Sequence, residues 1–306
     1  MRKLLILPVI LLVQSAWAES VELQSVIDAA RGACGGISND MADMKKKAGI
    51  STVVGAVGTV SSGVGLGAGI AKAKVDAEYD AVLGVLLAEY VSGYKPGAYV
   101  SGRVVDDALD DAASDNDDKA IADKISQLLQ KSKRLGNLRT GTMAVATVAN
   151  VATAAVAGSN TIKGDLESRV SDCIARVDEL SRIKMQARID GTGTSEQIAR
   201  ADAIYNACSK WGTVDLTPIN KRAKGAAISG GVGAGLGLAG TITSAIANSE
   251  KLRDGDDKKE KNMNTMANVL AGGTTAAGLT STIFSASQIS AIKRAATVAD
   301  ECEGAL

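Results

Sequence analysis

Four long stretches of this chain contain no charged residue, although 22% of all its residues are charged. They comprise residues 48–71, 140–162, 225–249 and 262–292. At a rise of about 1.5 Å per residue, each stretch is long enough to form a helix of about 35 Å. Any fold of this chain has to place four long uncharged elements, and this requirement restricts the fold more than any other feature.

The spacing of residues within these stretches predicts helices rather than strands. Valines and small residues each recur three or four positions apart in the first stretch, whereas a strand requires alternation with period two. The valines are Val53, Val57, Val60 and Val64, and the small residues are Gly55, Gly58, Ser62, Gly65 and Gly69. The third stretch repeats the pattern, with Ile228, Val232 and Leu236 beside Gly230, Gly233, Gly237 and Gly240. Each helix therefore carries two stripes.

The glycine stripes predict close packing between helices. Glycine inside a helix is about 0.5 to 1 kcal/mol less favourable than alanine, so a stripe of glycines requires a compensating gain. A line of residues without side chains supplies it, because a neighbouring backbone can then approach closely. We expect eight glycines to be helix-packing residues: Gly55, Gly58, Gly65, Gly69, Gly230, Gly233, Gly237 and Gly240.

Two other interpretations of segment 230–240 fit less well. Gly235, Gly237 and Gly240 match the pattern G-x-G-x-x-G, but a dinucleotide-binding fingerprint follows a strand and opens a helix. These glycines lie in the middle of an uncharged run. A flexible linker would not space its valine, isoleucine and leucine residues periodically. We therefore expect no bound cofactor.

The second and fourth stretches carry small-residue faces of a different composition. The second replaces glycine by alanine, and its face consists of Ala146, Ala149, Thr153 and Ala157. The fourth is less regular, and we expect its face to be formed by Gly272, Ala276 and Thr280.

On these spacings the four stretches resemble the glycine-zipper helical hairpins of bacterial envelope proteins. The resemblance covers about a hundred residues, and it rests on small-residue spacing. It implies an envelope-associated helix pair that is often inserted in a membrane or oligomeric. It implies no catalytic site.

A local duplication divides the chain into tandem units. The pattern D-A-x-x-x-A-C occurs at 28–34 and 202–208, and each copy precedes two uncharged stretches and a further cysteine. The expected fold is all-α, with tandem duplicated helical hairpins whose Gly/Ala-rich seams form a four-helix core, plus a small helical insert. The expected boundaries are 19–187 for the first unit with an insert at 72–139, 188–198 for a connector and 199–306 for the second unit.

The four cysteines, Cys34, Cys173, Cys208 and Cys302, predict two disulfides in an exported chain. Four cysteines allow three connectivities. If each unit is a hairpin, its two flanking cysteines lie at the same end, which favours Cys34 with Cys173 and Cys208 with Cys302. There is no C-x-x-C pair, and we expect no metal site.

Residues 1–18 have the features of a cleaved signal peptide. Arg2 and Lys3 precede a short apolar run, and Ala16-Trp17-Ala18 forms an A-x-A cleavage site. The apolar run is short for a membrane span. We expect export to the periplasm, the outer membrane or the extracellular space of a bacterium.

Composition argues against several classes of function. The chain has no histidine, the commonest general base and metal ligand. No motif names a paired acid and base, so we expect a non-enzymatic protein. Basic and acidic residues balance at 34 each, and no aromatic residues are interleaved with the basic ones, so nucleic acid is not an expected partner.

The first insert contains an aspartate-rich run at 106–118 and four of the five tyrosines, Tyr79, Tyr90, Tyr94 and Tyr99. The run lacks the central glycine and closing glutamate of a calcium loop, so a solvated acidic loop is the favoured interpretation and calcium the alternative. The tyrosines fit either a partner-contact surface or the cover of a small helical subdomain.

The composition of the four stretches suits both a soluble bundle and a membrane-inserted one, because Gly, Ser, Thr and Asn dilute the aliphatic content. The expected function is structural or interaction-based, in the envelope or outside the cell. The alternative is a membrane-inserting or pore-forming factor. The expected partners are a membrane or a protein, and the Gly/Ala seams could also join copies into a homo-oligomer.

Overall fold

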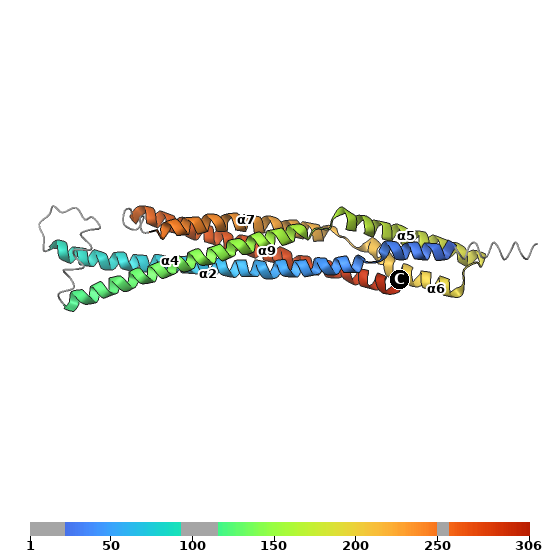
Figure 1. Ribbon diagram of the computed structural model, residues 1–306, viewed down its shortest axis with the longest axis horizontal. Coiled ribbons are helices and arrows are strands. Elements are labelled where there is room, and N and C mark those ends of the chain that lie inside the picture. Colours follow the sequence, from blue (N-terminus) through green and yellow to red (C-terminus); the bar gives the residue numbers. More distant parts are fainter. Residues whose placement is uncertain (1–21, 93–115, 250–256) are drawn as a thin grey trace, which may run out of the picture. The chain divides into compact units, whose positions relative to one another are not determined.

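The computed structural model describes residues 22–92, 116–249 and 257–306, and all of its regular elements are helices. The long helices are α2 (Ile37–Ser92), α4 (Asn116–Ser159), α5 (Gly164–Asp190), α7 (Thr217–Ala247) and α9 (Asp257–Ala305), and Figure 1 shows them. Shorter helical segments are residues 22–34, α6 (Ser195–Cys208) and the 3₁₀ turn η1 (Ser209–Thr213). The expected all-α fold is confirmed.

The chain packs into two compact units that take segments from both tandem halves. Among the described residues, unit 1 contains 22–51, Val156–Gly225 and Ile283–Leu306, and unit 2 contains those within Thr52–Ala155 and Ala226–Thr282. The boundary expected near 188–198 separates two halves that follow each other in the sequence. The two compact units are divided differently, because each contains segments from both halves. The described part of the insert consists of continuations of α2 and α4 rather than a separate subdomain.

Local sequence explains the turn between α5 and α6. Gly191 ends α5 with φ 69°, a left-handed conformation that glycine adopts readily, and its N–H donates to the carbonyl of Ala187. Thr194 then opens α6 with a capping box, in which its hydroxyl accepts from the backbone N–H of Gln197 and the Gln197 side chain accepts from the N–H of Thr194. The expected connector is therefore a tight turn inside unit 1.

Unit 1 has a core of large apolar side chains, as water-soluble helical domains do. Leu23, Ile27, Leu180, Ile204 and Trp211 are among its fully buried members. Both disulfides lie in this core. Cys34 bonds Cys173 and Cys208 bonds Cys302, which is the pairing that the sequence predicts.

An ion pair joins α5 to α6 in unit 1. The ammonium of Lys184, which is buried, lies 2.8 Å from a carboxylate oxygen of Asp202 and 4.7 Å from the ring centre of Tyr205. Arg188 also pairs with Asp202. The hydrogen bond from Lys184 holds the pKa of Asp202 below its ordinary value, and attraction to Lys184 and Arg188 acts in the same direction, against partial desolvation.

This lowered pKa predicts a pH-dependent contribution to stability. The folded chain binds a proton at Asp202 more weakly than the unfolded chain, so the pair stabilises above about pH 4 and the gain is lost as pH falls through the lowered pKa. We expect Asp202→Asn to reduce the free energy of unfolding by about 1 kcal/mol at pH 7. Urea unfolding should show this difference shrinking below pH 4, and an equal difference at pH 2.5 would contradict the assignment.

Candidate functional site

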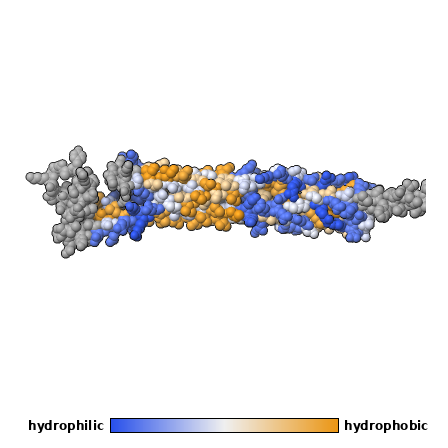
Figure 2. Space-filling model, viewed as in Figure 1, coloured by the Kyte–Doolittle hydropathy of each residue, from blue (hydrophilic) through white to orange (hydrophobic). Residues whose placement is uncertain are grey.

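The outward faces of unit 2 carry large apolar side chains on all four of its helices. Seventeen of them are between 40% and 69% exposed. We call this set the apolar belt: Val53, Val57, Val60, Val64, Ile70, Leu138, Val145, Val148, Val151, Ile228, Val232, Leu238, Ile242, Ile246, Met266, Val269 and Leu279. Figure 2 shows hydrophobic residues gathered over the middle of unit 2 on the visible face.

An apolar groove lies within the belt between α2 and α4. It has a volume of about 450 Å³. Only valine and alanine line it: Val54, Val57, Ala144, Val145, Val148, Ala149 and Ala152. A continuous uncharged surface of this kind is uncommon on proteins that work as monomers in water, and it marks a surface that contacts another apolar phase or molecule.

The side chains buried inside unit 2 are small or polar, whereas those buried inside unit 1 are large and apolar. In its uncharged stretches, all of which the structure describes, Met143 is the only buried apolar residue larger than alanine. The buried polar residues of these stretches are Ser62, Asn150, Thr153, Thr243, Ser244, Asn264, Thr274 and Ser281. Unit 2 thus has its large apolar groups outside and its small and polar groups inside.

The eight predicted packing glycines all lie at contacts between helices. A Cβ atom added at any one of them would come within 3.1 Å of an atom of another helix. At Gly230 on α7 the obstacle is backbone, because the added atom would lie 3.1 Å from the nitrogen of Ala154 and 3.2 Å from the carbonyl oxygen of Asn150 on α4. Glycine therefore permits direct contact between two helix backbones here.

Neighbouring glycines on the same helices face outward instead. A Cβ atom added at Gly63 or Gly67 of α2, or at Gly231 or Gly235 of α7, would meet nothing within 4 Å. The small-residue face predicted for the fourth stretch is wrong, because a different side of that helix faces its neighbours. Ala276 and Thr280 are exposed, and α9 instead buries Ala267, Ala271, Thr274, Gly278 and Ser281. Gly272, Gly273 and Gly278 belong to more than one possible stripe of small residues in this stretch. Their spacing alone does not show which stripe faces the neighbouring helices.

The small-residue contacts also give the direction of the helices in unit 2. Gly55 of α2 lies against Thr153 of α4, whereas Gly65 lies against Met143, so α2 and α4 are antiparallel. Along α7, Gly230 lies against Ala154 and Gly240 against Met143, so α7 is also antiparallel to α4. These seams are thus formed between helices of one chain.

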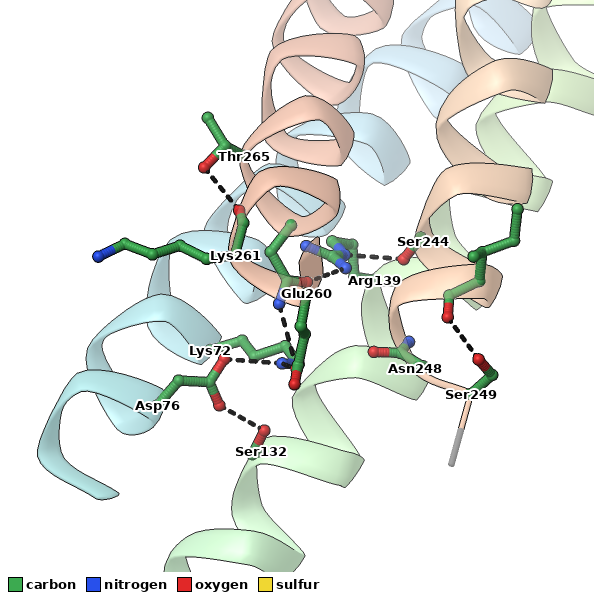
Figure 3. Close-up of polar contacts among 12 residues, drawn as sticks. Lys72, Asp76, Ser132, Arg139, Ser244, Asn248, Ser249, Glu260, Lys261 and Thr265 are labelled. Carbon is green, nitrogen blue, oxygen red and sulfur yellow. Dashed lines mark hydrogen bonds and ion pairs between the residues drawn. The ribbon is translucent and has the colours of Figure 1, made fainter. Parts of the chain in front are cut away.

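Charged and polar side chains form a cluster in unit 2 next to the ends of the uncharged stretches at Lys72, Arg139 and Lys261 (Figure 3). The ammonium of Lys72 on α2 is buried and lies 2.7 Å from Asp76 and 3.1 Å from Glu260 of α9. Ser132 of α4 donates to the other oxygen of Asp76 at 2.6 Å. Three helices are therefore tied together by one buried cation and two carboxylates.

Arg139 lies in the same cluster and is fully buried. Its guanidinium donates to Ser244 of α7 at 2.7 Å and to Asn264 and Asn268 of α9 at 2.8 and 3.3 Å. The composition of the chain did not single out this residue or Lys72. Their position in the sequence could have identified them. Each is the charged residue that borders an uncharged stretch, and each lies on the same side of the helix as the small-residue face.

The other predicted sites fall as follows. The acidic run 106–118, with its calcium alternative, and Tyr90, Tyr94 and Tyr99 lie outside the residues whose side chains the structure describes, and so does the signal peptide. Among the described residues, the cysteine, aspartate and glutamate side chains that come close enough together to hold a metal ion are Cys34, Cys208 and Cys302, and all three are in disulfides.

Comparisons with protein-family models, with curated proteins and with solved structures find no match to this chain.

Proposed function

We propose that unit 2 is a membrane-embedded four-helix bundle and that the chain is an exported, non-enzymatic envelope protein. The observation that carries the proposal is the apolar belt. Seventeen large apolar side chains on four helices face outward while glycine, alanine and small polar residues fill the interior. In water this arrangement is unfavourable, whereas in lipid the outside is solvated by acyl chains and the small interior lets helices pack closely.

The dimensions of the belt agree with a bilayer. The hydrocarbon core is about 30 Å thick, and an uncharged helix of about 23 residues is about 35 Å long. Within the described chain, three helical stretches are long and apolar enough to cross a membrane, inside Glu22–Gly84, Asp123–Asp190 and Thr217–Ala247. The fourth helix, α9, is not among these three, but it contributes the exposed apolar side chains Met266, Val269 and Leu279 to the belt.

Unit 1 fits an aqueous location beside the membrane. Large apolar side chains such as Leu23, Leu180 and Trp211 are buried in its core, and its disulfides are compatible with an oxidising compartment. Together with the predicted signal peptide, this supports a periplasmic, outer-membrane or extracellular site. The runner-up function is a soluble interaction protein whose apolar belt is covered by a protein partner.

Flotation with vesicles separates the two functions. The mature chain, expressed with its disulfides, is mixed with vesicles of phosphatidylethanolamine and phosphatidylglycerol and centrifuged through a density gradient. We expect it to float with the vesicles and to resist extraction by alkaline carbonate. A chain that stays behind as a stable soluble monomer would exclude the membrane-embedded function and leave the protein-partner function.

A charge in the belt should weaken membrane insertion. Val148 on α4 is 69% exposed and borders the apolar groove. Lysine near the centre of a membrane helix is unfavourable by about 2.5 to 3.5 kcal/mol, so we expect Val148→Lys to lower the partition coefficient about 100-fold. Met185→Lys, at a 61% exposed site on α5 in unit 1, is the matched control and should leave partitioning unchanged. Equal partitioning of both variants would place the belt outside the lipid.

A further inference from the structure

Asn150 lies at the centre of unit 2 with neither end of its amide paired. It is fully buried on α4, and among the described residues neither its Oδ1 nor its Nδ2 has a hydrogen-bond partner. Glycines from the other three helices surround it. A Cβ atom added at Gly58, Gly233 or Gly278 would lie 3.2, 2.9 or 3.3 Å from its amide atoms. The glycines thus make room for a polar group on the axis of the bundle.

Other polar groups stand beside this amide. Thr59 lies against Gly278 together with Asn150, and Ser62 donates to the carbonyl of Gly58, the glycine that faces Asn150. Thr153, one turn along α4, is also fully buried. A buried amide without partners is unfavourable in an apolar medium, and water is the small molecule that can donate to Oδ1 and accept from Nδ2. The hydroxyls of Thr59, Ser62 and Thr153 donate to carbonyls of their own helices, and their oxygens can still accept a hydrogen bond from such water.

Met143 separates Asn150 from the polar cluster. It lies two turns from Asn150 on the same face of α4 and is 1% exposed. Its side chain fills the space left by two glycines, since a Cβ atom at Gly240 would lie 2.7 Å from its Cε and one at Gly65 would lie 3.4 Å from its Sδ. Beyond it along α4 comes Arg139. Methionine has three rotatable side-chain bonds, so it is the most adaptable of the large apolar residues at such a position.

We propose that Asn150 binds water on the axis of unit 2 and that Met143 closes a path from this water to the Arg139 end, so that unit 2 is a gated conduit for water and small inorganic ions. The proposal rests on the membrane-embedded function above. A single apolar side chain in an otherwise small and polar seam acts as a hydrophobic constriction, which blocks ions by excluding water from one level of the path. Rotation of Met143 would join the two polar levels.

Conductance of the full mature chain in planar bilayers of phosphatidylethanolamine and phosphatidylglycerol tests the gate. In 0.1 M KCl we expect Met143→Ala to conduct at least about tenfold more than the unmodified chain, because the constriction is removed. Met143→Leu keeps the bulk and should stay closed. Met266→Ala, at a 55% exposed belt position, is the control for loss of a methionine and should also stay closed. Adding Asn150→Leu to Met143→Ala should restore low conductance, because the amide that binds water on the axis is lost.

Two outcomes would overturn the conduit. One is an unchanged conductance of Met143→Ala in a chain that floats with vesicles, and the other is high conductance that persists with Asn150→Leu. A chain that does not float refutes the membrane function instead. The water site has its own test in detergent micelles, independent of conductance. The side-chain NH₂ signal of Asn150, assigned by its loss in Asn150→Leu, should show cross-relaxation with water, and its absence would exclude bound water.

Discussion

The variant Gly230→Leu is expected to prevent the helices of unit 2 from packing as described. A side chain at this position meets backbone atoms of Ala154 and Asn150, and backbone cannot move aside as a side-chain end can. Overpacking a tight core usually destabilises by about 1 to 3 kcal/mol, and a clash with backbone belongs at the upper end or beyond. We expect a loss of at least about 3 kcal/mol, measured by unfolding in detergent with helical circular dichroism as the signal.

Gly231→Leu is the matched control, because it adds the same side chain one position along the same helix. Nothing lies within 4 Å of a Cβ atom added there, and leucine favours a helix by up to about 1 kcal/mol over glycine. Gly231→Leu should therefore be neutral or stabilising. Similar losses of unfolding free energy in the two variants would mean that α7 presents a different side to its neighbours than the one described. An unchanged free energy of unfolding in Gly230→Leu would contradict the close backbone contact.

Removing either disulfide is expected to destabilise unit 1 by about 4 to 5 kcal/mol. The two bonds close loops with sequence separations of 139 for Cys34–Cys173 and 94 for Cys208–Cys302. In the chain-entropy model, loops of that length lower the conformational entropy of the unfolded chain by the equivalent of this free energy. Urea unfolding of Cys208→Ala/Cys302→Ala at pH 7 measures the effect. A loss below about 1 kcal/mol would show that the unfolded chain is already compact without the bond.

Both cysteines of a pair must be replaced together in this experiment. The Sγ atoms of Cys34, Cys208 and Cys302 lie within 4.8 Å of one another. Replacement of Cys173, Cys208 or Cys302 alone would leave a thiol close to the other disulfide, where it can exchange by attack of its thiolate on sulfur. Peptide mapping under non-reducing conditions verifies that each double variant retains the remaining native pair.

Much of this architecture could be predicted from short-range patterns. The charge-free stretches and their three- and four-residue spacing gave long helices, and the expense of glycine inside a helix indicated that Gly230 or Gly233 must face a neighbour. The disulfide pairing followed from the ends of hairpins. These inferences need only helix geometry, which repeats along the chain.

The remaining features depend on contacts between distant residues. The periodic valines, Val60 and Val148 among them, are compatible with a buried or an outward stripe, and only the packed bundle places them outside. Asn150 has no local pattern that distinguishes it from a surface asparagine, because its burial is set by glycines on three other helices. The two compact units likewise arise from helices long enough to pass through both, so that no boundary in sequence marks them.

The most direct test of the central claim is the position of the belt in the lipid. The described chain has one tryptophan, Trp211, which is buried in the core of unit 1 and gives a baseline emission. Val148→Trp adds a second at the belt, and vesicles with bromine on their acyl chains quench tryptophans within the hydrocarbon. We predict strong quenching of the added emission and little change in that of Trp211. Emission from Val148→Trp that brominated lipid leaves intact, and that aqueous quenchers reduce, would show that the belt faces water and would contradict the account.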